Sequence, residues 1–164
     1  MKLPKILTKK RSWSDWLFII LIVFVLFLRL PGLIEQYNQE GQKINPVVID
    51  GKLFPPKDKK SILIFWASWC GPCTVELNRI NQAIDKKEIS SENIYAVNLG
   101  ESEEVVNKEI RDRKFKMAVV LDKNSELANL LKVQGTPTIV FIDNTETIKW
   151  LSSVISTSLI YRIK

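Results

Sequence analysis

The sequence contains no histidine, and its only cysteines are Cys70 and Cys73. Without histidine, the chain cannot build a cysteine-histidine nucleophile pair. Two thiols also fall short of the four ligands that a closed zinc site requires. We therefore expect no metal site, and no bound cofactor is predicted.

Beyond its first residues, the chain has no excess of basic charge. The net charge is +6, but five basic residues precede the first acidic one: Lys2, Lys5, Lys9, Lys10 and Arg11. From Gly32 onward, 18 Lys and Arg residues are balanced by 17 Asp and Glu residues. No basic stripe is left to bind phosphates, so nucleic-acid partners are not expected.

Polar residues are absent from residues 16–28, which read WLFIILIVFVLFL. A helix over residues 12–34, rising roughly 1.5 Å per residue, covers about 34 Å, enough for a membrane core of about 30 Å. A signal peptide is the alternative, but its cleavage requires small residues, and no alanine precedes Ala67. The sequence predicts an uncleaved anchor in a bacterial inner membrane, with the basic start in the cytoplasm and the domain outside.

Three regions are predicted: the basic start and transmembrane anchor over residues 1–34, a polar linker over 35–46, and one cored domain over 47–164. At the start of the domain, Asp50-Gly51 between two apolar runs predicts a β-hairpin. The apolar run ILIFW, ending at Trp66, predicts a strand buried on both faces of a sheet.

Strands and helices then alternate along the domain. Helices are predicted after Cys73, over 103–114 and over 126–133, the last capped by Asn124-Ser125, and strands over 94–99, 117–122, 136–143 and 147–153. In the helix over 103–114, we expect Val105, Val106 and Ile110 to face inward. The last two strands, joined at Asp143-Asn144, should pair antiparallel at the sheet edge. The pattern predicts an α/β fold with a mixed sheet flanked by helices.

Cys70 and Cys73 lie in the motif WCGPC, at a turn from strand to helix. As a structural staple, a four-residue loop would contribute only about 2 kcal/mol on the chain-entropy relation. Redox exchange is the favoured interpretation. Cys70, just ahead of the helix, should be the attacking thiol, because helix amides and the positive dipole end stabilise a thiolate. Cys73 should then attack the mixed disulfide formed on Cys70 and release the substrate. Pro72 should fix the turn at the helix start.

The segment FWASWCGPC closely resembles the active site of thioredoxins, and Gly135-Thr136-Pro137-Thr138 resembles the loop that carries their cis-proline. The resemblance implies a thioredoxin-like fold. It also implies that substrates contact two groups of residues, those beside the cysteines and those of the proline loop: Trp69, Gly71, Pro72, Thr136 and Pro137. An ordinary strand-opening proline is the alternative for Pro137.

Within thioredoxins, the chain is similar to the membrane-tethered TlpA and ResA group. CGPCTVEL places Glu76 where this group carries an acid, and VNLGESEEVVNKEI matches its inserted helix. Thioredoxin has a buried aspartate where this chain has Ile64, so Glu76 is the alternative base for the Cys73 proton. An acid that merely complements the helix start is the other interpretation of Glu76.

The resemblance implies thiol-disulfide exchange with extracytoplasmic cysteine-containing proteins. Reduction, as in apocytochrome maturation, is the expected direction, with electrons supplied by a membrane partner of the DsbD or CcdA type. A disulfide-forming oxidase and a redox-inactive membrane-tethered adaptor are the alternatives. The closing segment SSVISTSLIYRIK also resembles the suppressor-of-copper-sensitivity D type within the group.

Overall fold

The computed structural model describes residues 13–153, apart from the side chains of residues 29, 32, 33 and 35–37. The chain divides into two compact units, residues 1–35 and 36–164, which are described separately here. The basic start over residues 1–12 and most of the closing segment that resembles the suppressor-of-copper-sensitivity D type lie outside the described residues.

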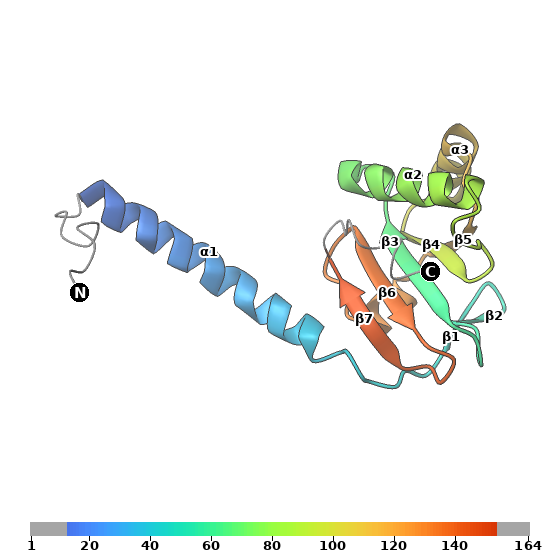
Figure 1. The fold of residues 1–164 in the computed structure, drawn as a ribbon, viewed down its shortest axis with the longest axis horizontal. Coiled ribbons are helices and arrows are strands. Elements are labelled where there is room, and N and C mark those ends of the chain that lie inside the picture. Colours follow the sequence, from blue (N-terminus) through green and yellow to red (C-terminus); the bar gives the residue numbers. More distant parts are fainter. Residues whose placement is uncertain (1–12, 154–164) are drawn as a thin grey trace, which may run out of the picture. The chain divides into compact units, whose positions relative to one another are not determined.

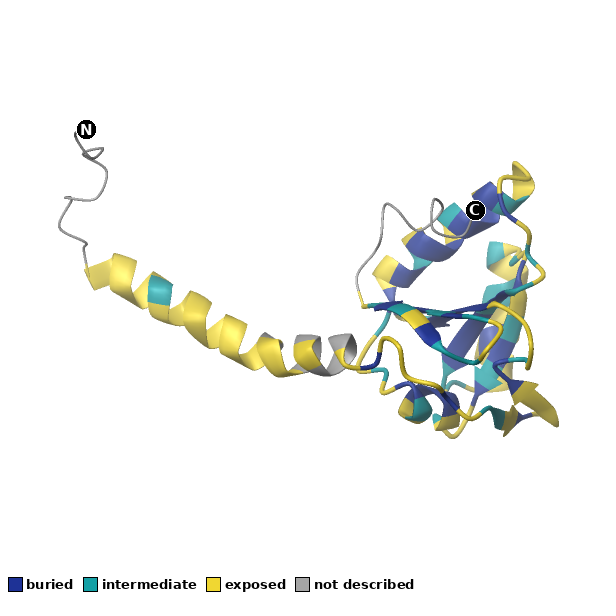
Figure 2. Cartoon of the chain, turned by 60° about the horizontal axis from the view of Figure 1, so that its bottom comes forward, coloured by how far each residue is buried: buried dark blue, intermediate teal, exposed yellow. Residues whose placement is uncertain are grey.

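The first unit contains helix α1, Trp13–Tyr37, which ends three residues beyond the predicted end. Between Leu17 and Leu28, every side chain except that of Ile19 is exposed, as the yellow helix in Figure 2 shows. Within the described part of the chain, however, no helix combines the length and apolarity that a membrane crossing requires. The predicted transmembrane helix is therefore not identified there.

The second unit is built on a five-stranded sheet with the strand order β5-β4-β3-β6-β7 (Figure 1). Strand β3, Ser61–Trp66, is central and runs parallel to β4, Ile94–Leu99, which is parallel to β5, Ala118–Asp122. Strands β6, Thr138–Ile142, and β7, Ile148–Ser152, are antiparallel to their neighbours. This arrangement confirms the predicted mixed sheet, with the final strand pair at its edge.

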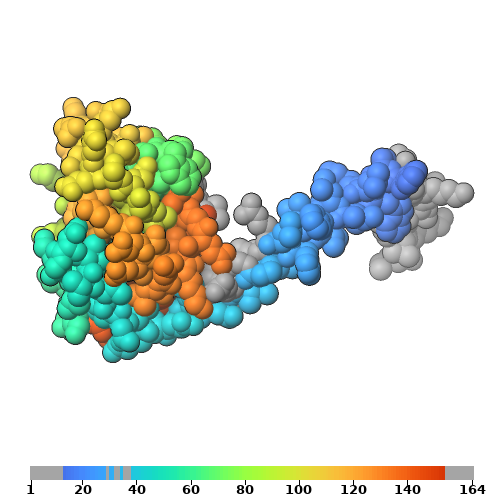
Figure 3. Space-filling view, turned by 180° about the vertical axis from the view of Figure 1, so that it is seen from behind, coloured from blue at the N-terminus to red at the C-terminus, as the bar shows by residue number. Residues whose placement is uncertain are grey.

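Both faces of the sheet are covered. Helices α2, Gly71–Asp85, and α3, Glu103–Arg113, lie on one face (Figure 1). Helix α4, Glu126–Leu130, packs on the other face together with the hairpin of β1, Val47–Ile49, and β2, Lys52–Phe54. Figure 3 shows the cyan hairpin and the orange segment around α4 side by side on that face.

Strand β3 lies at the centre of the core, and all six of its residues are buried. Because successive strand side chains point to opposite faces, Ile64 and Trp66 pack with α2 and α3, whereas Leu63 and Phe65 pack with α4 and the hairpin. The run ILIFW is therefore continuous because both faces need apolar side chains, as predicted. The loop after Trp66 therefore starts from a strand that is buried along its whole length.

The predicted hairpin turn at Asp50-Gly51 is confirmed. Both residues have positive φ, 48° and 75°, which a two-residue hairpin turn of this kind requires and which Gly51 adopts without strain. The register pairs Ile49 with Lys52. Of the hairpin's side chains, those of Ile49 and Phe54 are buried, so the hairpin closes one side of the core.

Two details of the helices differ from the predictions. In α3, Val106 is buried and Ile110 packs against the core as expected, but Val105 is 39% exposed and does not face inward. At the start of α4, the side chain of Ser125 forms no capping hydrogen bond. Instead, the buried carboxylate of Asp122 accepts the amide hydrogens of Leu127 and Ala128, at 3.2 and 2.8 Å. A charged acceptor from the preceding strand thus replaces the expected local cap.

The segment predicted as a linker is partly packed on the domain. Ile44 is buried in the core on the face of the sheet that α4 covers, and its amide donates to the Glu146 carbonyl at 2.9 Å. The Gly41 amide donates to the carbonyl of Ile148 at 2.7 Å. The polar, aperiodic sequence gave little signal of this contact, because it depends on one apolar side chain, that of Ile44, and on backbone hydrogen bonds. The chain therefore joins the edge of the domain before β1 begins.

Candidate active site

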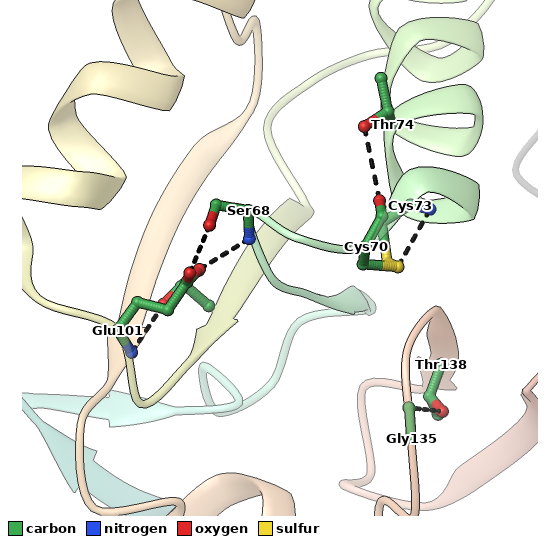
Figure 4. The surroundings of a disulfide bond; sticks show 8 residues. Ser68, Cys70, Cys73, Thr74, Glu101, Gly135 and Thr138 are labelled. Carbon is green, nitrogen blue, oxygen red and sulfur yellow. Dashed lines mark hydrogen bonds between the residues drawn. A yellow bond between two sulfur atoms is a disulfide. The ribbon is translucent and has the colours of Figure 1, made fainter.

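The two cysteines lie at the junction between β3 and α2. Strand β3 ends at Trp66, and Cys70 is the N-cap residue of α2, with extended backbone angles. A disulfide joins Cys70 and Cys73, whose Cα atoms are 5.3 Å apart. The Cys73 amide donates a hydrogen bond to the Cys70 sulfur at 3.2 Å (Figure 4). The sulfur of Cys70 therefore occupies the position of an N-capping acceptor, where partial positive charge favours an anion.

The redox motif exposes its flanking residues rather than its sulfurs. In the disulfide form, Cys70 is 4% exposed and Cys73 only 1% exposed. Trp69, by contrast, is 76% exposed, and Gly71 and Pro72 are also exposed. Pro72 lies in the first turn of α2, where its missing amide hydrogen leaves no helical bond unmade. A partner would therefore meet Trp69, Gly71 and Pro72 before it reaches the disulfide.

The proline loop lies beside the end of β3. Thr138, the first residue of β6, pairs with Phe65, so the preceding residue Pro137 is level with the start of residues 67–70, which we call the redox loop. The Thr136-Pro137 peptide bond is cis, a state that the sequence alone does not reveal. The Thr138 hydroxyl donates to the Gly135 carbonyl at 2.7 Å, which closes the loop (Figure 4).

Glu76 lies one helical turn after Cys73 on α2, and its side chain is fully buried. One carboxylate oxygen, Oε2, accepts a hydrogen bond from Arg79 at 3.2 Å, whereas Oε1 has no partner among the described residues. Burial raises the pKa of Glu76 above its ordinary value, and the positive charge of Arg79 only partly opposes this effect. Such a group can exchange a proton closer to neutral pH than an exposed glutamate.

The sequence did not reveal a second carboxylate at the redox loop, that of Glu101. Its Oε2 accepts the amide hydrogen of Ser68 at 2.7 Å, and its Oε1 accepts the Ser68 hydroxyl hydrogen (Figure 4). The side-chain amide of Asn98 donates to Oε2 at 2.6 Å. Partial burial acts to raise the pKa of Glu101, but the hydrogen bonds from Ser68 and Asn98 outweigh it, and the pKa is lowered.

Sequence comparison connects this site with known proteins. A model of the AhpC/TSA family matches residues 35–151. Sporulation thiol-disulfide oxidoreductase A of Bacillus subtilis is 32% identical over 131 residues, which are 71% of this chain and 79% of that protein. Thiol-disulfide oxidoreductase ResA of Bacillus cereus is 28% identical over 111 residues. That match covers 66% of this chain and 64% of ResA, slightly less than two thirds of the relative.

Structural comparison agrees on the fold. The crystal structure of StoA from Bacillus subtilis matches with a TM-score of 0.58 at 24% sequence identity, covering 76% of this chain and 96% of that structure. The likeness shows a thioredoxin-like α/β fold, and the matched relatives are thiol-disulfide oxidoreductases by name. The chain therefore belongs to the AhpC/TSA family of thioredoxin-like proteins and is a thiol-disulfide oxidoreductase.

Proposed function

We propose that this domain reduces protein disulfides outside the cytoplasm, with Cys70 as the attacking thiol and Cys73 as the resolving thiol. The observation that carries this proposal is the position of the Cys70 sulfur, which accepts the Cys73 amide at the start of α2. A sulfur in this position is stabilised as a thiolate, and the thiolate is the nucleophile in disulfide exchange.

The exchange transfers two electrons from the dithiol to the substrate. The Cys70 thiolate attacks one sulfur of a substrate disulfide, forms a mixed disulfide and releases the other substrate sulfur as a thiolate. Cys73 then loses its proton and attacks the Cys70 sulfur. This second step forms the Cys70–Cys73 disulfide, which is the state in the structure, and releases the second substrate thiol.

Glu76 is proposed as the base in the second step. It lies three residues after Cys73 on α2, a spacing that places both side chains on one helix face. Its buried Oε1 has no partner among the described residues, and burial raises its pKa. A carboxylate with a raised pKa accepts a proton more readily near neutral pH, so Glu76 would take the proton that Cys73 releases.

Substrate contact is proposed for the exposed residues around the disulfide and for the proline loop. Trp69, Gly71 and Pro72 are exposed beside the cysteines. The cis Thr136-Pro137 bond lies level with the end of β3, where the backbone of Thr136 would pair with an extended substrate segment. Apocytochromes are one class of cysteine-containing substrate that such a surface would suit.

An extracytoplasmic position at the bacterial inner membrane is part of the proposal. It is supported by the exposed apolar side chains of α1 and by the basic residues that precede the first acidic one. The reductive direction needs a dithiol donor that converts the Cys70–Cys73 disulfide back to two thiols, and a membrane partner of the DsbD or CcdA type would supply it. Fractionation of cells after alkaline extraction tests the attachment, because loss of the chain into the soluble fraction contradicts it.

An insulin-reduction assay tests the activity. The protein with a dithiol donor should accelerate insulin reduction, and Cys70→Ser should abolish the acceleration. Absence of exchange with any protein disulfide in the wild-type protein would favour the adaptor alternative instead.

A trapping variant tests the direction. Cys73→Ala should leave Cys70 joined to its natural partner in a mixed disulfide, because the resolving thiol is missing. If the trapped partners are proteins that need a disulfide for their activity, the chain is an oxidase. If they are proteins that need free thiols, the result supports the reductase.

A further inference from the structure

The redox loop is a tight turn that is hydrogen-bonded to a residue far along the chain. The amide of Cys70 donates to the carbonyl of Ala67 at 3.1 Å, which closes a four-residue turn over residues 67–70. Ser68 is the second residue of this turn. Both of its hydrogen-bond donors, the amide and the hydroxyl, bind the carboxylate of Glu101, which is 33 residues further along the chain. The turn that positions Cys70 is thus anchored to the connection between β4 and α3.

The carboxylate of Glu101 is itself fixed. Asn98 donates from its side-chain amide to Oε2 at 2.6 Å, and its oxygen accepts the Glu101 amide hydrogen at 3.2 Å. Asn98 is fully buried in β4, directly opposite Trp66 of β3 in the parallel register. The three side chains therefore join the end of β3, the end of β4 and the redox loop in one network.

This network is built for a charged carboxylate. Glu101 accepts three hydrogen bonds from Ser68 and Asn98, and all three donors point at its two oxygens. Hydrogen bonds to an ionised acceptor are about twice as strong as neutral ones. An amide in its place would turn one acceptor into a donor, and a shorter acid would not reach both donors of Ser68.

We infer that Glu101 is a positioning residue for thiol-disulfide exchange: by holding Ser68, its carboxylate keeps the Cys70 sulfur at the amino end of α2. This inference rests on the proposed function. Glu101 makes none of its described contacts with the cysteines, so it acts through Ser68. Without the anchor, the turn over residues 67–70 samples other conformations, and the sulfur loses contact with the Cys73 amide for part of the time.

The sign of the effect separates this role from a simple effect of charge. A negative charge near a thiol raises the thiol pKa, so removal of the charge alone would make Cys70 more reactive at neutral pH. Loss of positioning has the opposite effect, because the thiolate loses the helix amides that stabilise it. Glu101→Asp distinguishes the two further, because it keeps the charge but shortens the side chain.

The test is the rate of alkylation of Cys70 in the reduced protein as a function of pH, followed by peptide mass spectrometry, with Glu103→Gln as the control. Glu103 is also acidic and lies in the first turn of α3, but its side chain is 65% exposed and pairs only distantly with Lys123. At pH 7 we expect Glu101→Gln and Glu101→Asp to slow alkylation about threefold to tenfold. Ser68→Ala should slow it less, because the hydrogen bond from the backbone amide of residue 68 to Glu101 remains.

Faster alkylation in Glu101→Gln, with a wild-type rate in Glu101→Asp, would overturn the inference in favour of a charge effect. Wild-type profiles in all of these variants, with or without a loss of stability, would overturn it in favour of a purely structural network. If the Glu101 variants do not fold, Ser68→Ala alone decides: an unchanged profile contradicts the inference. A wild-type protein that exchanges no disulfides would refute the proposed function, but the alkylation profiles would still test the position of Cys70.

Discussion

Two carboxylates border the redox loop, and they differ in how deeply they are buried and in how many hydrogen bonds they accept. Glu76 on α2 is fully buried, and one of its oxygens has no partner among the described residues. Glu101, in the connection from β4 to α3, accepts three hydrogen bonds. The pKa of Glu76 is raised, mainly by burial, whereas the pKa of Glu101 is lowered because hydrogen bonds outweigh its partial burial.

Because of these surroundings, Glu76 suits proton transfer better than Glu101 does. A carboxylate saturated with donors stays ionised, since protonation would break its hydrogen bonds, and it therefore suits a fixed anchor. A buried carboxylate with an oxygen that has no partner among the described residues accepts a proton at a higher pH than an exposed glutamate does. Where the environments of two acids separate their pKa values in this way, the two groups take different chemical roles.

The largest effect should come from Glu76→Gln. Without a base, the attack of Cys73 on the mixed disulfide should slow by about 100-fold at neutral pH, the lower range for acid-base catalysis. Stopped-flow measurement of a single turnover with a substrate disulfide would show this as accumulation of the mixed disulfide. Alkylation of Cys70 is the internal control and should not become slower, because Glu76 is not the base for Cys70. A wild-type rate for the second step would remove Glu76 from the mechanism.

Glu101→Ala should instead lower stability. Its loss leaves the Ser68 amide and hydroxyl and the Asn98 amide without their charged acceptor, which should cost about 2 to 3 kcal/mol in the free energy of unfolding. Urea unfolding of the oxidised protein measures this. A change below about 0.5 kcal/mol, the usual range for surface substitutions, would show that the network does not hold the loop.

The two acids should give the stability opposite dependences on pH. The pKa of Glu101 is lowered in the folded state, so its contribution is complete above the unfolded value of 4.5 and is lost as the pH falls. The pKa of Glu76 is raised, so the folded state is relatively most stable below 4.5 and loses stability as the pH rises through the folded pKa.

Thermal unfolding from about pH 3 to pH 8 measures this contrast. The stability advantage of wild type over Glu101→Gln should shrink toward acidic pH, whereas the advantage of Glu76→Gln over wild type should grow toward alkaline pH. Parallel curves for both variants would show that the two carboxylates do not differ as described.

The smallest effect should come from Ser68→Ala, which removes one of the three hydrogen bonds to Glu101 and keeps the amide contact. We expect a loss of about 1.5 kcal/mol in the free energy of unfolding, the lower limit for one hydrogen bond to a charged group. Urea unfolding checks this value. A loss as large as that of Glu101→Ala would mean that the hydroxyl alone, and not the shared carboxylate, holds the turn.

The same contrast explains what the sequence could predict. The redox motif, the apolar run of β3 and the position of Glu76 are each visible within a few consecutive residues, so local sequence patterns were sufficient to predict them. The anchor from Glu101 to Ser68 joins residues 33 positions apart, and only the packing of β4 beside β3 brings them together. The polar Asn98 near the end of β4, and Glu101 just after that strand, were the available signal.

The error at Val105 has a related cause. Three valine and isoleucine residues near one another in a short helix fit more than one inward face, and the contacts of α3 with the sheet decide which face is buried. Likewise, the buried acceptor that caps α4 comes from Asp122 on the preceding strand rather than from the local Asn124-Ser125. Tertiary packing overrides local preference at both positions.

The central claim is that the Cys70 sulfur is stabilised as a thiolate at the amino end of α2. Titration of the reduced protein, followed by the ultraviolet absorbance of the thiolate and assigned with Cys73→Ala, measures this directly. We predict that Cys70 ionises well below the ordinary cysteine pKa of about 8.5. A value at or above that of a free cysteine would contradict it.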